Sequence, residues 1–398
     1  MRKSILLLSS LMIAVSIFAQ YSIGNKKFIL IDKSRSNRSI LTFVYYPATS
    51  TGLDAPIVDD GNKFPVVSFG RGFVMSSLAY QWLVEALVPY GYIVAFPGTE
   101  EGVPPNHSDF GKDEVFVARA FRNYGDSATS FLFGKTNGYT AVGGHSMGGG
   151  ASFLGMQNVR DITTFFNFSA AETFITESAI QSAKNCTRPA LVFTGTKDCV
   201  APPIGNSRFM YNNLNSEYKF FANIIGASHC QFGDPKKTPC ELGETVACAG
   251  TTYIPSADQK NKVILLLKPW LDFWTKRECA AITTYYSNVA SNLSAFDTLQ
   301  SKIITCGALD VTTSVRNLSI LKANLFPNPS NGSFTLEIGE NYSKGHLQLI
   351  DVTGKIVDAQ NFNNQRSIVL HYPLVAKGIY QLQFDTEKGN YTARMVIE

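Results

Sequence analysis

Residues Ala141–Ser152 read AVGGHSMGGGAS, a stretch with five glycines among its twelve residues. Each glycine in an ordered element costs roughly 0.5–1 kcal/mol relative to alanine, so a cluster of glycines calls for a physical reason. Within the stretch, Gly144 to Gly148 form the pattern G-x-S-x-G, with a strand-like run before it and a helix-like run after it. In that context the pattern predicts a nucleophile elbow, a tight strand-to-helix corner that carries Ser146. The alternative interpretation is a glycine-rich turn without chemistry.

From Ser39 to Lys276 the chain alternates strand-like and helix-like runs. The apolar runs FPVVSFG, YIVAFPG and PALVFTGT are typical of buried strands, whereas SSLAYQWLVEALVPYG and KVILLLKPWLDFWTKRE have helical spacing. This alternation predicts an α/β fold with a doubly wound, mostly parallel sheet buried on both faces. Near Cys306 the pattern changes to short alternating strands separated by turn residues, which predicts a small all-β sandwich.

A serine nucleophile requires a base, and His229 is the histidine that fits. His107 precedes the serine, His145 is adjacent to it in sequence and so points elsewhere, and two more lie in the C-terminal β region, His346 and His371. His229 follows the strand-like run YKFFANIIG in a short loop. A nucleophile elbow requires the chain order serine, acid, histidine, so His229 is the predicted base.

The predicted acid is Asp198, which ends the run PALVFTGTKD directly after a strand. Catalytic groups in open α/β sheets gather at the carboxyl ends of strands, and Asp198 lies at that edge. Asp161 is less suitable because it lies near the far end of the helix after the serine. Glu172 and Glu177, which follow the preceding strand, remain the alternatives.

These residues predict acyl transfer through an acyl-enzyme on Ser146. His229 takes the serine proton, and Asp198 orients the imidazole and stabilises its cation. The oxyanion needs two backbone N–H donors, which are predicted at Met147 and at Phe73 in the loop RGFVMSS. A plain strand-to-helix turn is the alternative for that loop.

Four stretches, SFGRGFVMSS, GHSMGGGAS, TGTKDCVAP and GASHC, resemble the α/β-hydrolases of the cutinase, polyester hydrolase (PET hydrolase-like) and dienelactone hydrolase-like group. The run RSILTFVYYPA also resembles the opening of chlorophyllase-like and platelet-activating-factor-acetylhydrolase-like members. The resemblance covers roughly residues 27–306. It implies a serine carboxylic-ester hydrolase whose triad and oxyanion donors are Ser146, Asp198 and His229 with Phe73 and Met147.

The substrate side of the site departs from this group. Its polyester hydrolases usually carry a tryptophan after the strand that follows the serine helix, whereas this loop reads SAAETF, with Ala171 near that place. The long loop GTEEGVPPNHSDFGKDE is either a solvated loop or a wall of the cleft. The candidate substrate contacts are therefore His145, Ala171, His107 and Phe110.

Only Ala170 to Arg188 separate two core strands, which leaves little room for a lid over the serine. We therefore expect an open, lidless site that takes ester substrates, including polymeric ones. An amidase or peptidase with the same triad is one alternative, because the triad fixes acyl transfer and not the leaving group. A catalytically inactive surface-binding protein is another.

The N-terminus predicts export. Arg2 and Lys3 precede an apolar run from Ile5 to Phe18, which predicts a signal peptide over residues 1–19. A membrane anchor is the alternative, but the run is shorter than the roughly 20 residues that a membrane span needs.

The C-terminal stretches NLFPNPSNGSF, LQLIDVTGKIV and YTARMVIE resemble the sorting domain of type IX secretion cargo, over residues 323–398. This resemblance implies the type IX machinery as a partner and passage through the periplasm and outer membrane, with release or attachment at the cell surface. An adhesive or carbohydrate-binding sandwich is the alternative. The catalytic domain is then expected at residues 20–306 and a linker at 307–322.

Seven cysteines in an exported chain make disulfides possible, and their odd number leaves at least one unpaired. Contact between Asp198 and His229 would bring their sequence neighbours together, so one expected bridge joins Cys199 to Cys230. A Cys186–Cys199 bridge is the alternative.

The other cysteines lie nearer the end of the catalytic region. A bridge between Cys240 and Cys248 would close a small loop. The hydrolase resemblance implies a further bridge between Cys279 and Cys306. No cysteine or histidine pattern has metal-ligand spacing, so no metal or cofactor is expected.

The composition is that of an ordinary globular protein, with 45% hydrophobic and 17% charged residues. The formal net charge of +4 over 398 residues is too small to favour nucleic acid or an anionic membrane as a partner. We expect a monomer whose partners are its ester substrate and the export machinery.

Overall fold

The computed structural model describes residues 21–173, 177–234, 240–309, 319–320, 323–339, 342–351, 356–373, 375–386 and 389–398. The predicted signal peptide lies outside the described residues. The chain divides into two units, Met1–Leu309 and Asp310–Glu398, and each has its own hydrophobic core.

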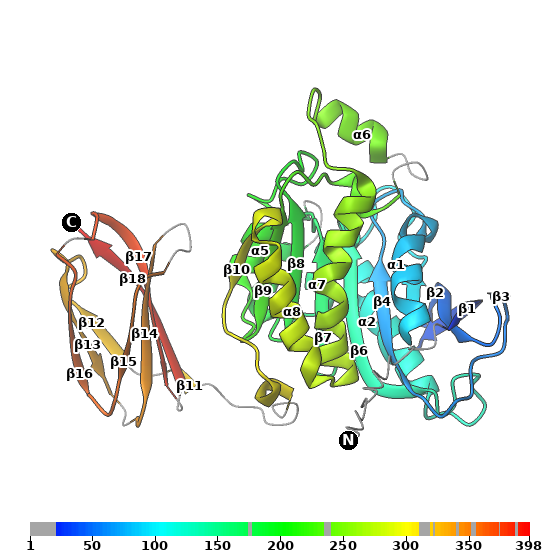
Figure 1. Cartoon of the computed structure of the whole chain (residues 1–398), viewed down its shortest axis with the longest axis horizontal. Coiled ribbons are helices and arrows are strands. Elements are labelled where there is room, and N and C mark those ends of the chain that lie inside the picture. Colours follow the sequence, from blue (N-terminus) through cyan, green and yellow to red (C-terminus); the bar gives the residue numbers. More distant parts are fainter. Residues whose placement is uncertain are drawn as a thin grey trace, which may run out of the picture. The chain divides into compact units, whose positions relative to one another are not determined.

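A ten-stranded sheet forms the centre of the first unit, in the order β10-β9-β8-β7-β6-β4-β5-β2-β1-β3 (Figure 1). All neighbours from β5 to β9 are parallel, and antiparallel pairing joins β2 to β5, β1 to β2 and β10 to β9. This arrangement confirms the predicted α/β fold. The strands are β1 (Ser22–Asp32), β2 (Arg38–Ala48), β3 (Gly52–Leu53), β4 (Phe64–Gly70), β5 (Ile93–Pro97), β6 (Thr136–His145), β7 (Thr164–Phe168), β8 (Ala190–Gly195), β9 (Lys219–Ile224) and β10 (Phe296–Gln300).

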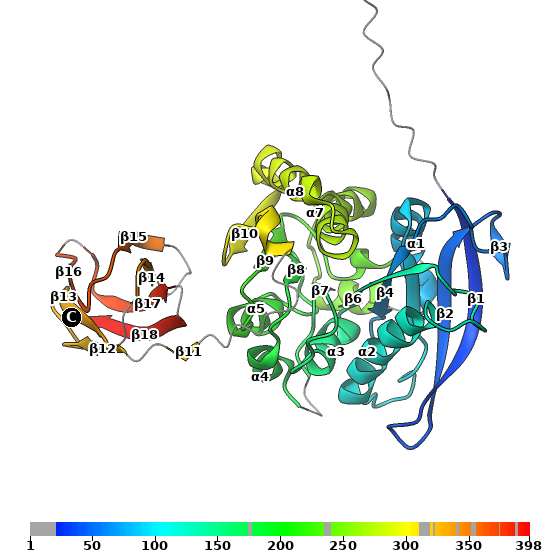
Figure 2. The ribbon, with the colours of Figure 1, turned by 90° about the horizontal axis from the view of Figure 1, so that it is seen from below.

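Helices cover both faces of this sheet, which is why its central strands are continuous apolar runs (Figure 2). One face carries α1 (Gln81–Leu87), α7 (Ser256–Lys276) and α8 (Cys279–Ser291), which pack over a core centred on the fully buried Trp270. The other face carries α2 (His107–Tyr124), α3 (Met147–Gly155), α4 (Ala179–Ser182) and α5 (Ser207–Asn213). A further helix, α6 (Cys240–Ala247), follows β9. Short 3-10 helices are η1 (Ser77–Tyr80), η2 (Val88–Tyr90), η3 (Ala183–Asn185), η4 (Cys230–Phe232), η6 (Leu293–Ala295) and η7 (Cys306–Leu309).

Some elements were not predicted by the sequence pattern. Strands β1 and β10 lie at or near the sheet edges, where partly exposed polar residues obscure the apolar pattern. Helix α8 contains several β-branched and polar residues, and it is held to the core by Ala281, Ile282 and Tyr285. Helix α2 begins at His107, inside the stretch expected to be a loop, because the Asn106 side chain caps it by accepting from the Asp109 amide at 3.0 Å.

The hairpin of β1 and β2 is fixed to α2 by buried charge. Asp113 of α2 is fully buried, and its carboxylate accepts hydrogen bonds from Arg35 at 2.5 Å and from Arg38 at 2.7 Å. Thr99 also donates to it, at 2.5 Å, and Arg38 in turn pairs with Glu100 at 2.7 Å. These bonds satisfy a carboxylate that would otherwise be costly to bury.

The second unit consists of two small sheets that share one core. The larger has the order β11-β18-β17-β14-β15, and the smaller has the order β12-β13-β16. Its pairings are antiparallel except for β11 with β18, and Phe334, Leu347 and Leu382 are among the buried residues between the sheets. The strands are β11 (Ser319–Ile320), β12 (Ala323–Phe326), β13 (Ser333–Ile338), β14 (Gly345–Asp351), β15 (Ile356–Phe362), β16 (Ser367–His371), β17 (Gly378–Thr386) and β18 (Gly389–Ile397).

Across the part of the chain that the structure describes, no helix has the length and apolar character needed to cross a membrane.

Candidate active site

Ser146 lies at the corner between β6 and α3, in a conformation that few non-glycine residues adopt. Its φ is 53° and its ψ is −113°, and such backbone strain persists only where the surroundings enforce it. Here the Ser146 amide donates to the Phe168 carbonyl at 3.0 Å, and the Ala171 amide donates to the Ser146 carbonyl at 2.9 Å. The end of β7 and the segment that follows it therefore fix both the amide and the carbonyl of Ser146.

The glycines around Ser146 allow backbone to pack directly against backbone. A Cβ on Gly148 would clash with the Gly70 carbonyl, and a Cβ on Gly144 would clash with the Gly148 carbonyl. A Cβ on Gly149 would come within 2.8 Å of the Cα of Ala170. None of these three glycines has positive φ, so the sequence uses them for close approach and not for an unusual conformation.

The structure brings Ser146, His229 and Asp198 together in one hydrogen-bonded chain. The Oγ of Ser146 lies 2.9 Å from Nε2 of His229, and Nδ1 of His229 lies 2.8 Å from Oδ2 of Asp198. The Asp198 carboxylate also accepts from the amides of Val200 at 3.0 Å and Ala201 at 2.7 Å through Oδ1. Because one carboxylate oxygen is held by the backbone, the other is fixed toward the imidazole.

Burial and charge act in opposite directions on His229. Burial disfavours the imidazolium and lowers the pKa of His229, but the Asp198 charge, the hydrogen bond to Asp198 and the more distant Glu244 charge together outweigh it. The net result is a raised pKa. The Asp198 charge therefore favours the protonated form of His229.

The loop that carries His229 is held from behind by α6 and α7. Glu244 of α6 accepts from the amides of His229 at 2.7 Å and Cys230 at 3.0 Å, and from the Ser228 hydroxyl at 3.1 Å. Gln259 of α7 accepts from the Ser228 amide and donates to the Ser228 carbonyl, each at 2.9 Å. No motif marked Glu244 or Gln259 in the sequence, so their part in the site becomes visible only in the folded chain.

The two predicted oxyanion donors lie on separate segments beside the serine. Met147 is the first residue of α3, and the loop of Phe73 approaches α3 through the Gly148 amide, which donates to the Arg71 carbonyl at 3.1 Å. Neither the Met147 nor the Phe73 amide makes a hydrogen bond to another residue in the described ranges. Both are therefore available to an anionic oxygen.

His145 is fully buried beneath the site and leaves no surface for a substrate. Its Nε2 lies 3.1 Å from the His229 carbonyl and its Nδ1 lies 2.9 Å from the Tyr80 hydroxyl. Burial, and then the proximity of His229, hold the pKa of His145 well below its ordinary value. Because a carbonyl only accepts, the neutral ring carries its proton on Nε2 and accepts from Tyr80 at Nδ1.

The Tyr80 hydroxyl also accepts from the Gly72 amide at 2.9 Å. A continuous set of hydrogen bonds therefore runs from the loop of Phe73, through Tyr80 and His145, to the backbone of His229. These hydrogen bonds fix the position of the candidate oxyanion loop relative to the candidate base.

The other candidate substrate contacts differ in position. Ala171 is half-buried, and its amide donates to the Ser146 carbonyl, so it borders the serine directly. Phe110 is fully buried under the Arg71 guanidinium, whose centre lies 5.4 Å from its ring centroid. His107 is half-buried in the first turn of α2, and burial lowers its pKa.

The alternative acids are engaged elsewhere. Glu172 accepts from the amides of Ala179 at 3.0 Å and Ile180 at 2.8 Å at the start of α4. Asp161 pairs with Arg119 at 2.6 Å on the surface. Glu177 makes a hydrogen bond with Gln157 at 3.2 Å.

Two expected disulfide pairings, Cys199–Cys230 and Cys240–Cys248, are wrong, because Cys230 pairs with Cys240. The Cα atoms of Cys230 and Cys240 are 5.7 Å apart. The hydrogen bonds of Glu244 hold α6 against the loop of His229 and so place Cys240 beside Cys230. No local sequence pattern predicts this contact.

The remaining cysteines fall into two groups. Cys279 and Cys306 form a disulfide, the pairing that the hydrolase resemblance implied. Cys186 is buried and unpaired, so the alternative Cys186–Cys199 bridge is absent, and Cys199 and Cys248 are also unpaired.

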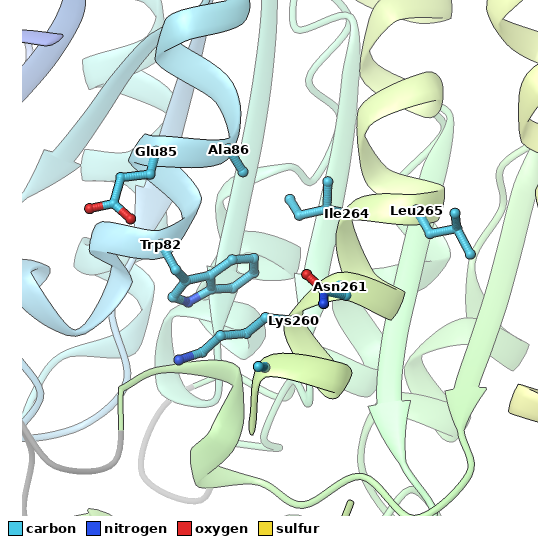
Figure 3. Close-up of a pocket in the computed structure, with 8 residues that line it drawn as sticks. Trp82, Glu85, Ala86, Lys260, Asn261, Ile264 and Leu265 are labelled. Atoms are coloured by element: carbon cyan, nitrogen blue, oxygen red, sulfur yellow. The ribbon is translucent and has the colours of Figure 1, made fainter. Parts of the chain in front are cut away.

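An open pocket of about 450 Å³ lies between α1 and α7, away from the serine (Figure 3). In Figure 3 the Trp82 indole reaches from α1 toward α7, where Ile264 also lines the pocket. The indole N–H donates to the Phe232 carbonyl at 3.0 Å, so Trp82 anchors the turn that follows His229. Among the described residues, no group of histidine, cysteine and acidic side chains could hold a metal ion.

Comparison with protein-family models gives two matches. Residues 42–246 match the model of PET hydrolase-like proteins, a range that covers more than half of the chain and includes Ser146, Asp198 and His229. The chain belongs to the PET hydrolase-like family. Residues 324–398 match the secretion system C-terminal sorting domain, so this PET hydrolase-like protein is exported by type IX secretion to the cell surface or the extracellular space. A comparison with curated proteins returned no match.

We predict that Asp198→Asn lowers kcat on a soluble ester by about 10³–10⁴-fold, since the amide would leave the imidazole in the wrong tautomer. A base must be unprotonated to act, so activity rises with pH through the raised pKa of His229. Without the Asp198 charge, burial dominates and the acidic limb of kcat/KM moves to lower pH. The measurement is kcat/KM against pH. Asp161→Asn is the control, and an unmoved limb in Asp198→Asn would contradict the assignment.

We predict that Tyr80→Phe lowers kcat by roughly tenfold with little change in KM, because it leaves the Gly72 amide and His145 Nδ1 without a partner. The matched control is Tyr46→Phe. Tyr46 is also buried, and its hydroxyl donates to the Ala55 carbonyl at 2.9 Å, away from the serine. Steady-state kinetics and Tm of both variants separate loss of positioning from loss of stability, and equal kcat in the two variants would refute the positioning role.

Proposed function

We propose that this PET hydrolase-like protein is a secreted serine carboxylic-ester hydrolase that acts through an acyl-enzyme on Ser146 in an open site. The observation that carries the proposal is the hydrogen-bonded chain from Ser146 through His229 to Asp198 at the end of a strained strand-to-helix corner. Family membership supports ester hydrolysis as the reaction.

In the first half-reaction His229 takes the Ser146 proton as the oxygen attacks the ester carbonyl carbon. The amides of Met147 and Phe73 stabilise the resulting oxyanion, and the imidazolium returns the proton to the leaving alcohol. Water then enters, His229 deprotonates it, and the same steps release the acid and free Ser146. The partial exposure of Ser146, beside an almost fully buried His229, supports attack on a substrate that arrives from solvent.

Exposed apolar side chains support an extended, apolar ester as the substrate. Phe73 and Val74 lie on the candidate oxyanion loop with 42% and 49% of their surface exposed, and Val200 and Ile204 follow Asp198 with 43% and 68% exposed. The loop of Ile204 is tied toward the serine, because Asn206 accepts from the Glu172 amide at 2.8 Å. Such residues offer contact area to a polymer chain that a small soluble ester does not use.

We predict that Ser146→Ala abolishes ester turnover, by at least about 10⁴-fold, while Tm stays close to that of the wild type. The assay is one panel of nitrophenyl esters of graded acyl length, a polyester film and a peptide substrate. Ser287→Ala, at an exposed serine of α8, is the matched control and keeps full activity. Unchanged ester turnover in Ser146→Ala would refute the serine mechanism.

The same panel decides between the proposal and its competitors. Cleavage of the peptide in preference to every ester would establish an amidase or peptidase instead. Binding to the film without any turnover would establish an inactive surface-binding protein. The open site needs a separate assay at an oil–water interface, where strong activation would contradict it.

We predict that Ile204→Ser reduces product release from the polyester film by roughly threefold to tenfold and leaves kcat/KM for nitrophenyl acetate unchanged. The reason is the loss of about 0.7–1.4 kcal/mol of apolar contact that only a long substrate makes. Ile29→Ser, at a 67% exposed isoleucine of β1, is the control. Equal losses on both substrates would contradict a role for Ile204 in holding the polymer.

A further inference from the structure

Two of the three unpaired cysteines lie together beside the candidate acid. Cys199 directly follows Asp198, and Cys248 follows the end of α6, about 50 residues further along the chain. The Sγ of Cys199 lies 3.4 Å from the Lys197 carbonyl, and the Sγ of Cys248 lies 4.0 Å from the same oxygen. The two sulfurs therefore approach the same carbonyl oxygen, which places the thiols beside each other.

The third unpaired cysteine has a different environment. Cys186 is fully buried in the core on the α3 side of the sheet, where its thiol contacts the carbonyls of Phe153 at 3.3 Å and Ser182 at 3.5 Å. Cys199, by contrast, is only half-buried, so another protein can reach its sulfur. The environment of Cys186 therefore sets it apart from the other two unpaired cysteines.

We propose that Cys199 and Cys248 form a third disulfide in the exported protein. Two S–H bonds break and one S–S bond forms, with loss of two protons and two electrons. The electrons pass to the disulfide of a thiol–disulfide exchange protein, which is reduced to its dithiol through a mixed disulfide on the reachable Cys199. The type IX sorting domain takes the chain out of the reducing cytosol, and disulfides persist in the periplasm and beyond.

This bond gives α6 a covalent tie at each end. Cys240, at the start of α6, is bonded to Cys230 next to His229, and Cys248, after its last turn, would be bonded to Cys199 next to Asp198. Between them, Glu244 holds the amide of His229. The segment of α6 thereby fastens the acid loop to the base loop, and the bond protects the Asp198–His229 geometry against thermal opening.

The decisive measurement counts free thiols in the full chain, purified after export and without reductant. The protein is unfolded in denaturant with N-ethylmaleimide, its intact mass is recorded, and a non-reducing digest is mapped by tandem mass spectrometry. We expect one adduct, on Cys186, and a linked peptide pair that contains Cys199 and Cys248. Three adducts, on Cys186, Cys199 and Cys248, with the other two disulfides intact, would overturn the proposal.

Variants supply a second, independent test. Cys199→Ser, Cys248→Ser and the double variant should each lower Tm by the same amount, about 5–10 °C, because either single change removes the whole cross-link. Cys186→Ala should show no adduct and retain the linked peptide pair. Losses in Tm that add in the double variant would show two independently packed thiols and refute the bond. Adduct count and Tm do not depend on turnover, so the result stands apart from the proposed esterase function.

Discussion

The corner at Ser146 is the constraint on which the rest of the catalytic unit depends. A serine with positive φ between a strand and a helix is strained, and the fold maintains it with backbone hydrogen bonds from the adjacent segments. Those segments come close only because Gly144, Gly148 and Gly149 lack side chains. Because these glycines let the backbone segments pack closely, the Ser146 hydroxyl is held in one direction.

Around that corner, buried charge is placed where it is compensated. Asp198 and His229 are almost fully buried, and each meets a complete set of partners: two amides on the carboxylate, and the carboxylate and the serine on the imidazole. Glu244, behind the loop of His229, is compensated in the same way: its carboxylate accepts hydrogen bonds from two amides and one hydroxyl. A buried carboxylate costs little when every acceptor is used, and it then orients whatever donates to it.

His145 illustrates how sequence proximity misleads. It is adjacent to the serine, but it points into the core, where it joins the loop of Phe73 to the backbone of His229 through Tyr80. The same lesson applies to the cysteines. The neighbours of Asp198 and His229 do not pair with each other, because α6 returns to both loops and supplies Cys240 to the base loop.

The sequence alone predicted the elbow, the chain order serine, acid, histidine, and most of the strands and helices of the first unit, because each leaves a local pattern of apolar spacing, glycine or strand end. It also determined the family, through motifs that sit at those strand ends. Folding alone sets the contacts of Glu244, Gln259 and Tyr80, the direction of His145 and the partner of Cys230. These depend on contacts between segments far apart in the chain. No periodicity records such contacts, since they follow from how helices pack on the sheet.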